Sequence, residues 1–309
     1  MEDVLECLPR TMAEKITELP EQIKSEIEEI RIRVDRPLEV MAGGNPVFLR
    51  YIPTEHDAEH LMNRLAHFSF YTLEEELKKG YITIEGGHRV GIAGKVILEN
   101  GQVKAIRHFS SFNIRIAREK IGIAQQFTSV LYKKRWLSTM IIGAPQTGKT
   151  TFLRDIARII STGVPERNIP PYKVGIVDER SEIAGCVHGI PQLHFGPRVD
   201  VLDACPKAEG MMMLIRSMSP DVLIVDEIGR EEDAQAILEA VNAGISLIMT
   251  THGDSIEDIK KRPILKNILD QQTFQLFIEL IRKEKPGIVA KIRDSRGLIL
   301  KNNEGGLHV

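Results

Sequence analysis

The sequence predicts an α/β protein of two domains, in which a small α+β domain precedes a larger domain built on a parallel sheet. The chain has 309 residues, which is long enough for two separate hydrophobic cores. The first 120 residues mix short helices with alternating strands and glycine turns. Apolar runs in the second half have the form of buried strands, namely 137–142, 172–177, 222–225 and 245–249. We therefore expect domains at 1–120 and 137–309, joined by a linker at 121–136.

The elements of the N-terminal domain are predicted from hydrophobic periodicity. Apolar residues recur at three- and four-residue steps over 4–30, which indicates short packing helices separated by Pro9 and Pro20. Alternation over 29–40 predicts a half-buried strand, and an amphipathic pattern predicts a helix over 57–70. Shorter strands are expected beside glycine turns, at 47–51, 81–84, 89–93, 95–98 and 110–116.

Residues 143–150 read Gly-Ala-Pro-Gln-Thr-Gly-Lys-Thr and fit the phosphate-binding loop pattern G-x-x-x-x-G-K-[ST] at every fixed position. An apolar strand precedes this loop and helical spacing over 151–160 follows it, which is the context that the loop requires. The glycines Gly143 and Gly148 let the backbone turn so that successive amides point at a β-phosphate. The nucleotide-binding residues are therefore expected to be Gly143, Ala144, Pro145, Gln146, Thr147, Gly148, Lys149, Thr150 and Thr151.

Four side chains have expected roles toward ATP and Mg²⁺. Lys149 should reach the β- and γ-phosphates, and the Thr150 hydroxyl should bind the Mg²⁺ that accompanies the nucleotide. Residues 222–225 are followed by Asp226 and Glu227, which is the usual form of the strand beside a phosphate-binding loop. We expect Asp226 to order the Mg²⁺ shell and Glu227 to polarise the attacking water.

Two further strand ends carry candidate catalytic residues. The strand 172–177 ends in Asp178 and Glu179, and it lies in the chain between the two strands of the phosphate site. This order is typical of oligomeric ATPases with a catalytic glutamate and not of small-molecule kinases. The strand 245–249 leads through threonines to His252, where a histidine can respond to the γ-phosphate.

The remaining residues predict how the second domain is completed. Helical spacing indicates helices over 209–218, 233–242 and 256–269, and the methionines of the first are expected in the core. Three further strands are expected to extend the sheet in antiparallel order, at 274–280, 287–292 and 298–300. The last residues, 302–309, are expected to fray.

Charge and cysteine content argue against several functions. A formal net charge of −2 and a pI near 6.5 give no reason to expect a nucleic-acid partner. Cys7, Cys186 and Cys205 form no C-x-x-C pair, so neither a disulfide framework nor a zinc ribbon is expected. The chain has no secretory signal pattern and no apolar window long enough to span a bilayer, which favours a soluble cytoplasmic protein.

Several stretches together resemble one known family over nearly the whole chain: Glu29–Arg33, Gly87–Gly91, Asn113–Arg118, Asp178–Ile183 and Asp226–Arg230. The family is that of the stage III sporulation protein AA ATPases of endospore-forming bacteria, which are related to the type II and type IV secretion ATPases. The resemblance implies a RecA-like P-loop ATPase core and assembly into a homo-oligomer, a hexameric ring. It also implies that membrane proteins of the sporulation channel complex are partners, on the mother-cell side of the engulfed forespore.

The resemblance implies roles for particular residues as well. An acidic cluster and a histidine recur in that superfamily, and they fall here at Asp178, Glu179 and His252. Arginines of the N-terminal domain that would contact phosphates fall at Arg89, Arg115 and Arg118. The chain departs from the secretion ATPases at Asp226, where those proteins commonly have glycine, and it lacks the four-cysteine zinc element of some type II members.

Two other functions are compatible with the same core. A nucleic-acid translocase or helicase would favour basic and aromatic residues along a channel, whereas this chain has one Trp and five Tyr. A nucleotide-dependent scaffold would bind ATP without turnover, and the presence of Glu227 argues against it. The leading hypothesis is an ATP-hydrolysing motor of a secretion-like transenvelope channel in endospore formation.

Overall fold

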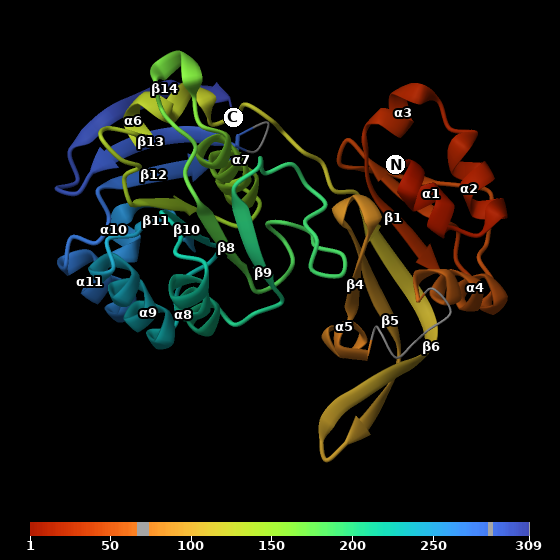
Figure 1. The fold of residues 1–309 in the computed structure, drawn as a ribbon. Coiled ribbons are helices and arrows are strands. Elements are labelled where there is room, and N and C mark those ends of the chain that lie inside the picture. The colour runs from red at the N-terminus through yellow and green to blue at the C-terminus, as the bar shows by residue number, and fades with distance from the viewer. Residues whose placement is uncertain (67–73, 284–286, 309) are drawn as a thin grey trace. The chain divides into compact units, whose positions relative to one another are not determined.

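The computed structural model describes residues 1–66, 74–283 and 287–308, and the chain divides into two compact units (Figure 1). The N-terminal unit comprises Met1–Arg118 and Gly185–His188, and the P-loop unit comprises Glu119–Ala184 and Gly189–Val309. No sequence pattern predicts that the short segment Gly185–His188 belongs with the N-terminal unit. Each unit has its own sheet and its own buried core.

The N-terminal unit is built on a sheet of six strands whose neighbours are all antiparallel. Its order is β3 (Asn45–Phe48), β2 (Glu39–Ala42), β1 (Ile27–Arg33), β6 (Gln102–Arg115), β5 (His88–Glu99) and β4 (Tyr81–Ile84). The helices are α1 (Glu2–Cys7), α2 (Arg10–Thr17), α3 (Glu21–Ser25), α4 (Glu55–Leu65) and α5 (Glu74–Lys79). The last part of the helix expected over 57–70 lies outside the described residues.

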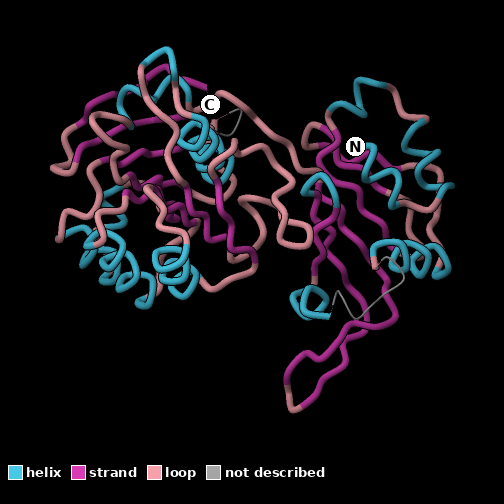
Figure 2. Tube along the Cα trace, in the orientation of Figure 1, coloured by secondary structure: helices cyan, strands magenta, loops and turns pink. Residues whose placement is uncertain are grey.

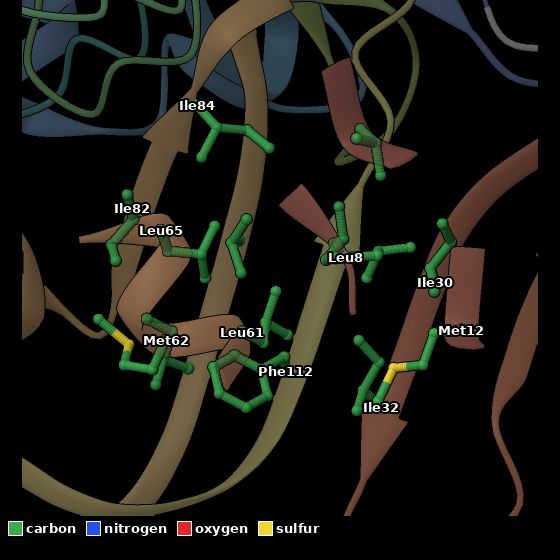
Figure 3. Close-up of a cluster of buried hydrophobic side chains, with 14 of the residues drawn as sticks. Leu8, Met12, Ile30, Ile32, Leu61, Met62, Leu65, Ile82, Ile84 and Phe112 are labelled. Carbon is green, nitrogen blue, oxygen red and sulfur yellow. The ribbon is translucent and has the colours of Figure 1, made fainter. Parts of the chain in front are cut away.

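The core of this unit follows from the predicted periodicity. Pro9 and Pro20 precede α2 and α3 as their N-cap residues, so the helices are separated where the sequence indicated. Buried side chains of the helices, such as Met12 and Leu61, meet buried side chains of the sheet, such as Phe112, in one cluster (Figure 3). This arrangement covers one face of the sheet with apolar side chains.

The strands β5 and β6 form a long hairpin, and here the sequence expectation of separate short strands is wrong. Figure 1 shows the hairpin extending beyond the other strands of its sheet. Gly94, which lies between two of the expected strands, pairs with Phe109 inside the hairpin; the register shifts on both sides of it, and the neighbouring His108 has φ 47°. A Cβ at Gly94 would come within 2.7 Å of the His108 carbonyl oxygen, so the shift requires glycine.

The P-loop unit contains an eight-stranded sheet with helices on both faces (Figure 2). Its order is β14 (Ile299–His308), β13 (Ile288–Asp294), β12 (Leu276–Ile281), β7 (Thr139–Gly143), β11 (Ser246–His252), β10 (Val222–Val225), β8 (Val174–Asp178) and β9 (Val199–Asp203). The strands from β12 to β9 run parallel to one another, so the expectation that the strand at 274–280 is antiparallel is wrong. The strands β13 and β14 extend the sheet in antiparallel order as expected.

Three further expectations about this sheet need correction. The strand β10 does not lie directly beside β7, because β11 pairs with both of them and separates them. The strand β9 was not predicted, since its residues are only half-buried and carry Asp200 and Asp203 among the valines. The C-terminal residues do not fray within the described part of the chain, because β14 stays paired with β13 as far as His308.

The helices of the P-loop unit are α6 (Thr128–Leu131), α7 (Lys149–Thr162), α8 (Lys207–Ser217), α9 (Glu231–Asn242), α10 (Ile256–Ile259) and α11 (Pro263–Asp270). The single helix expected over 256–269 is two helices, because Pro263 starts a new one at its first position. On α8 Met211 is buried, but Met218 caps the helix end and is exposed, so it is not a core residue. No helix in the described ranges has the length and apolarity needed to cross a membrane.

Candidate nucleotide site

The loop between β7 and α7 has the backbone geometry of a phosphate cradle. Gly148 has φ 89° and precedes the first residue of α7, and none of the described side chains caps this helix N-terminus. The first amides of α7 therefore keep their donors for a ligand. Gln146 also has a positive φ, 62°, which is uncommon outside glycine. A Cβ at Gly143 would come within 2.4 Å of the Thr147 hydroxyl, so this position requires glycine. These features fit the phosphates of a nucleotide.

The ammonium of Lys149 lies within this loop. Its Nζ donates to the carbonyl oxygens of Gly143 at 2.9 Å and Ala144 at 3.0 Å, and it lies 3.2 Å from Nδ1 of His252. Burial lowers the pKa of Lys149, while the nearby carboxylates of Asp226 and Glu227 oppose that shift. The lysine is thus held at the centre of the loop as a desolvated cation.

Thr150 and Asp226 meet at the end of the parallel strands. The Thr150 hydroxyl donates to one carboxylate oxygen of Asp226 at 2.7 Å, and the Thr250 hydroxyl donates to the other. A hydroxyl and a carboxylate oxygen this close together are suitable ligands for Mg²⁺, which prefers oxygen. The structure therefore brings together the two residues expected to hold the metal, although β11 lies between β7 and β10.

Glu227 follows β10 and is held at both its backbone and its side chain. Its φ is 54°, and its N–H donates to the Thr250 hydroxyl at 2.8 Å. One carboxylate oxygen lies 2.8 Å from Nε2 of His252, and the other accepts a hydrogen bond from Arg180 at 3.2 Å. Because Lys149 donates to Nδ1 of His252, the ring proton belongs on Nε2, where it is donated to Glu227. Lysine, histidine and glutamate are thus connected in one chain of contacts.

Asp178 is placed differently from what the sequence suggested. It is buried, and its carboxylate accepts hydrogen bonds from the backbone N–H groups of Glu182, Ile183 and Ala184 at 2.8–2.9 Å. Burial raises the pKa of Asp178 to about 6, against the effect of these amides. A catalytic role for Asp178 does not match this position, because its oxygens are used to fold the loop that follows β8.

Glu179, the second acidic candidate, is partly exposed and forms ion pairs at the site. Its carboxylate lies 3.0 Å from Nζ of Lys207 and 3.3 Å from a guanidinium nitrogen of Arg230. Burial acts to raise the pKa of Glu179, but the hydrogen bond and charge of Lys207, with the nearby arginines, hold it below its usual value. Lys207 also donates to the backbone carbonyl of Glu227 at 2.9 Å. Glu179 is therefore linked to Glu227 through one lysine.

Arg89 and Arg115 of the N-terminal unit are brought side by side. They are direct partners across β5 and β6, and Arg115 faces Glu29 of β1 at 3.5 Å with 61% of its side chain exposed. The Arg89 guanidinium lies 3.5 Å from the ring centre of Tyr81. Like charges in facing positions are unfavourable, so this pair is a candidate for binding an anion. Arg118 instead donates to the backbone oxygens of Ser25 and Ile27, both at 2.8 Å, which anchors the segment after β6 to the start of β1.

Sequence reasoning missed three residues that support the site. Arg154 of α7 donates to the carbonyl oxygens of Ile183 and Glu182, and Lys207 and Arg180 contact Glu227. Arg180 directly follows the acidic pair at the end of β8, and this position could have drawn attention to it. Lys207 and Arg154 lie in ordinary helical sequence and carry no comparable signal.

The strand order and the phosphate-binding loop define a RecA-like ATPase fold. The structure is similar to the Legionella pneumophila ATPase DotB, with a TM-score of 0.61, 15% identity, and coverage of 93% of this chain and 81% of that one. It is also similar to the pilus retraction motor PilT with bound ADP, with a TM-score of 0.56, 17% identity, and coverage of 84% and 75%. At these identities the similarity concerns the fold, and it confirms the predicted fold class.

The sequence comparisons are more specific. The family model for sporulation stage III, protein AA matches residues 2–300. The stage III sporulation protein AA of Bacillus subtilis (strain 168) is 57% identical over 305 residues, which cover 99% of each chain. The chain belongs to the sporulation stage III protein AA family, which confirms the family that the sequence motifs resemble.

Proposed function

We propose that this protein binds ATP with Mg²⁺ and hydrolyses it. The observation that carries the proposal is that three parallel strands end at one place and connect Lys149, His252 and Glu227 by contacts of 2.8–3.2 Å. The adjacent contact between Thr150 and Asp226 lies at the same strand ends. Such a cluster combines a cation for phosphate, oxygen ligands for a metal and a carboxylate for water, which are the components of phosphoryl transfer.

Each side chain has a role in this proposal. The amides at the start of α7 and the ammonium of Lys149 bind the phosphate oxygens. Thr150 and Asp226 hold Mg²⁺, which when bound neutralises charge on the phosphates. Glu227 orients a water molecule and accepts its proton, and His252 fixes one oxygen of that carboxylate.

The test is a phosphate-release assay on the purified protein with ATP, in Mg²⁺ and in excess chelator. We expect turnover that requires Mg²⁺. If phosphate release stays at the level of buffer in Mg²⁺ while ATP still binds in calorimetry, the chain is a nucleotide-dependent scaffold and not an enzyme.

We propose further that the protein works as a homo-oligomeric motor, a hexameric ring that energises a channel in endospore formation through membrane proteins. Membership of a sporulation family supports this proposal, as do the folds shared with an ATPase and with a pilus retraction motor. In this proposal the protein acts from the mother-cell cytoplasm, and Arg89 and Arg115 serve the phosphates of the bound nucleotide. Mass in solution, measured by light scattering with and without a nucleotide analogue, tests the ring. A monomer under both conditions would contradict it.

A further inference from the structure

Both the backbone and the side chain of Glu227 are held by contacts with other residues. Its backbone is in the left-handed region at φ 54°, a conformation that a glutamate rarely adopts. Its N–H is bound by Thr250 and its carbonyl oxygen by Lys207, so the backbone is fixed on both sides. The side chain can still rotate about its own bonds, and the contacts that oppose this rotation are those of its two oxygens with His252 and Arg180.

Arg180 is carried by a loop that is fixed at several points. The Asp178 carboxylate binds three amides of this loop, and Arg154 of α7 binds two of its carbonyl oxygens at 2.7 and 3.0 Å. The hydroxyl of Ser181, whose φ is 53°, donates to Asp203 of β9 at 2.7 Å. The backbone that carries Arg180 is therefore ordered before its guanidinium meets Glu227, which lowers the entropy lost on forming that ion pair.

We propose that Arg180 is a positioning residue that holds the Glu227 carboxylate in its productive orientation. This inference rests on the proposed ATPase function. A carboxylate has about four lone-pair positions, so one hydrogen bond from His252 and one from Arg180 fix its plane and leave other positions for a water molecule. Since Arg154 ties the same loop to α7, the helix that follows the phosphate-binding loop, the orientation of Glu227 depends on that helix.

The closing experiment compares Arg180→Ala with the wild type and with Arg216→Ala, which removes an exposed arginine of α8 on the same unit. We expect Arg180→Ala to lower kcat by about 10- to 100-fold, in the range found for small displacements of catalytic groups. KM and the affinity for a non-hydrolysable ATP analogue should stay within about twofold. Arg180→Lys should recover part of kcat, because it restores the charge without the planar guanidinium.

A double variant separates positioning from a general structural effect. If Arg180 acts through Glu227, adding Arg180→Ala to Glu227→Gln should produce no further loss of the residual single-turnover rate. A further loss equal to that in the wild-type background would overturn the proposal, as would unchanged kcat in Arg180→Ala. A tenfold or greater loss of analogue affinity would also overturn it, because Arg180 would then contact phosphate directly.

The failure of the proposed function gives a different result. In that case the wild type itself has no turnover, and the ATPase assignment fails before the variants are compared. A crystal structure of Arg180→Ala then tests the orientation of the Glu227 carboxylate independently of activity. We expect the carboxylate to turn away from its wild-type orientation. An unchanged orientation would overturn the inference.

Discussion

Lys149 is bound by two carbonyl oxygens of its own loop and by His252. We expect Lys149→Ala to lose nucleotide binding, by about 100-fold or more, because an ammonium that is already desolvated makes strong hydrogen bonds to phosphate. Isothermal calorimetry with ATP and Mg²⁺ measures this, and Lys134→Ala, at an exposed lysine of the same unit, is the control. Binding as tight as in the wild type would show that this loop does not bind the phosphates.

Glu227 differs from Lys149, because its proposed role is in the hydrolysis step and not in binding ATP. We expect Glu227→Gln to keep its ATP affinity and lower kcat by about 10²- to 10⁴-fold, because an amide of nearly the same shape cannot accept the proton of water. Phosphate release and calorimetry on the same preparation separate the two effects. Undiminished turnover would move the role of base to Glu179, the carboxylate that Lys207 links to Glu227.

Asp178 makes the stability of the P-loop unit depend on pH. Burial raises the pKa of Asp178 from its ordinary 3.8 to about 6, so the native state holds this proton more tightly than the unfolded state. Its contribution is fully present below pH 3.8 and is lost as pH rises through about 6, a change of about 3 kcal/mol in the free energy of unfolding. In Asp178→Asn that component should be absent.

Urea unfolding at several pH values between 4 and 7 tests this prediction. The fluorescence of Trp136, the single tryptophan of the chain, follows the P-loop unit because its side chain is buried there. Other groups titrate in the same range, so the difference between wild type and Asp178→Asn is the quantity to compare. A difference that does not change with pH would contradict the assignment of this pKa to Asp178.

At the scale of elements, the turn into α7 sets the backbone geometry of the nucleotide site. Gly148 has φ 89°, and Gly244, just after α9, has φ 78° with no atom within 4 Å of a built Cβ. Alanine at either position should cost about 1 to 2 kcal/mol of stability, because both backbones are left-handed. Only Gly148→Ala should also weaken ATP binding. Equal nucleotide affinity in the two variants, measured by calorimetry, would contradict this role of the turn.

The elements that could be predicted from the sequence are those with a strong local signal. The strand β10 is a continuous apolar run, and β7 and β8 are mostly apolar and fully buried. The phosphate-binding loop is a motif whose glycines are needed for its backbone conformation. Strand order has no such signal, so the place of β11 between β7 and β10 was not foreseen. The half-buried edge strand β9 also carries too weak a pattern to be recognised.

The candidate site shows the same division. Some site residues occupy fixed positions in motifs or at strand ends, so residue type and spacing are enough to predict them: Lys149, Thr150, Asp226 and Glu227. The contacts made by Arg180 and Lys207 depend on how a loop and a helix return to the strand ends. Such long-range contacts follow from tertiary structure, which residue spacing does not encode, and for the same reason the burial of Asp178 was not anticipated.

At the scale of the whole molecule, the arginine pair of β5 and β6 carries the last prediction. Arg115 lies on the strand face opposite Ile114, which is fully buried, and it is largely exposed as the alternation of its strand predicts. Its direct partner Arg89 adds a second guanidinium group, and Glu29, which also pairs with Arg31, lies 3.5 Å from Arg115. Two guanidinium groups in facing positions on neighbouring strands suit the oxygens of a phosphate.

We expect Arg115→Ala or Arg89→Ala to lower turnover at saturating ATP much more than they lower ATP affinity, because an arginine of this kind acts on charge that develops during phosphoryl transfer. Removal of such an arginine costs about 10³- to 10⁵-fold where it acts as a finger. Arg118→Ala is the contrasting variant, since its guanidinium is bound to backbone oxygens and its loss should lower the thermal midpoint.

If the arginines act across a subunit boundary, mixing Arg115→Ala with Glu227→Gln protein should restore some activity, because a mixed ring contains sites with both groups intact. Wild-type turnover in Arg89→Ala and Arg115→Ala alike would leave the N-terminal unit without a part in catalysis, and the natural alternative for it would then be a docking module.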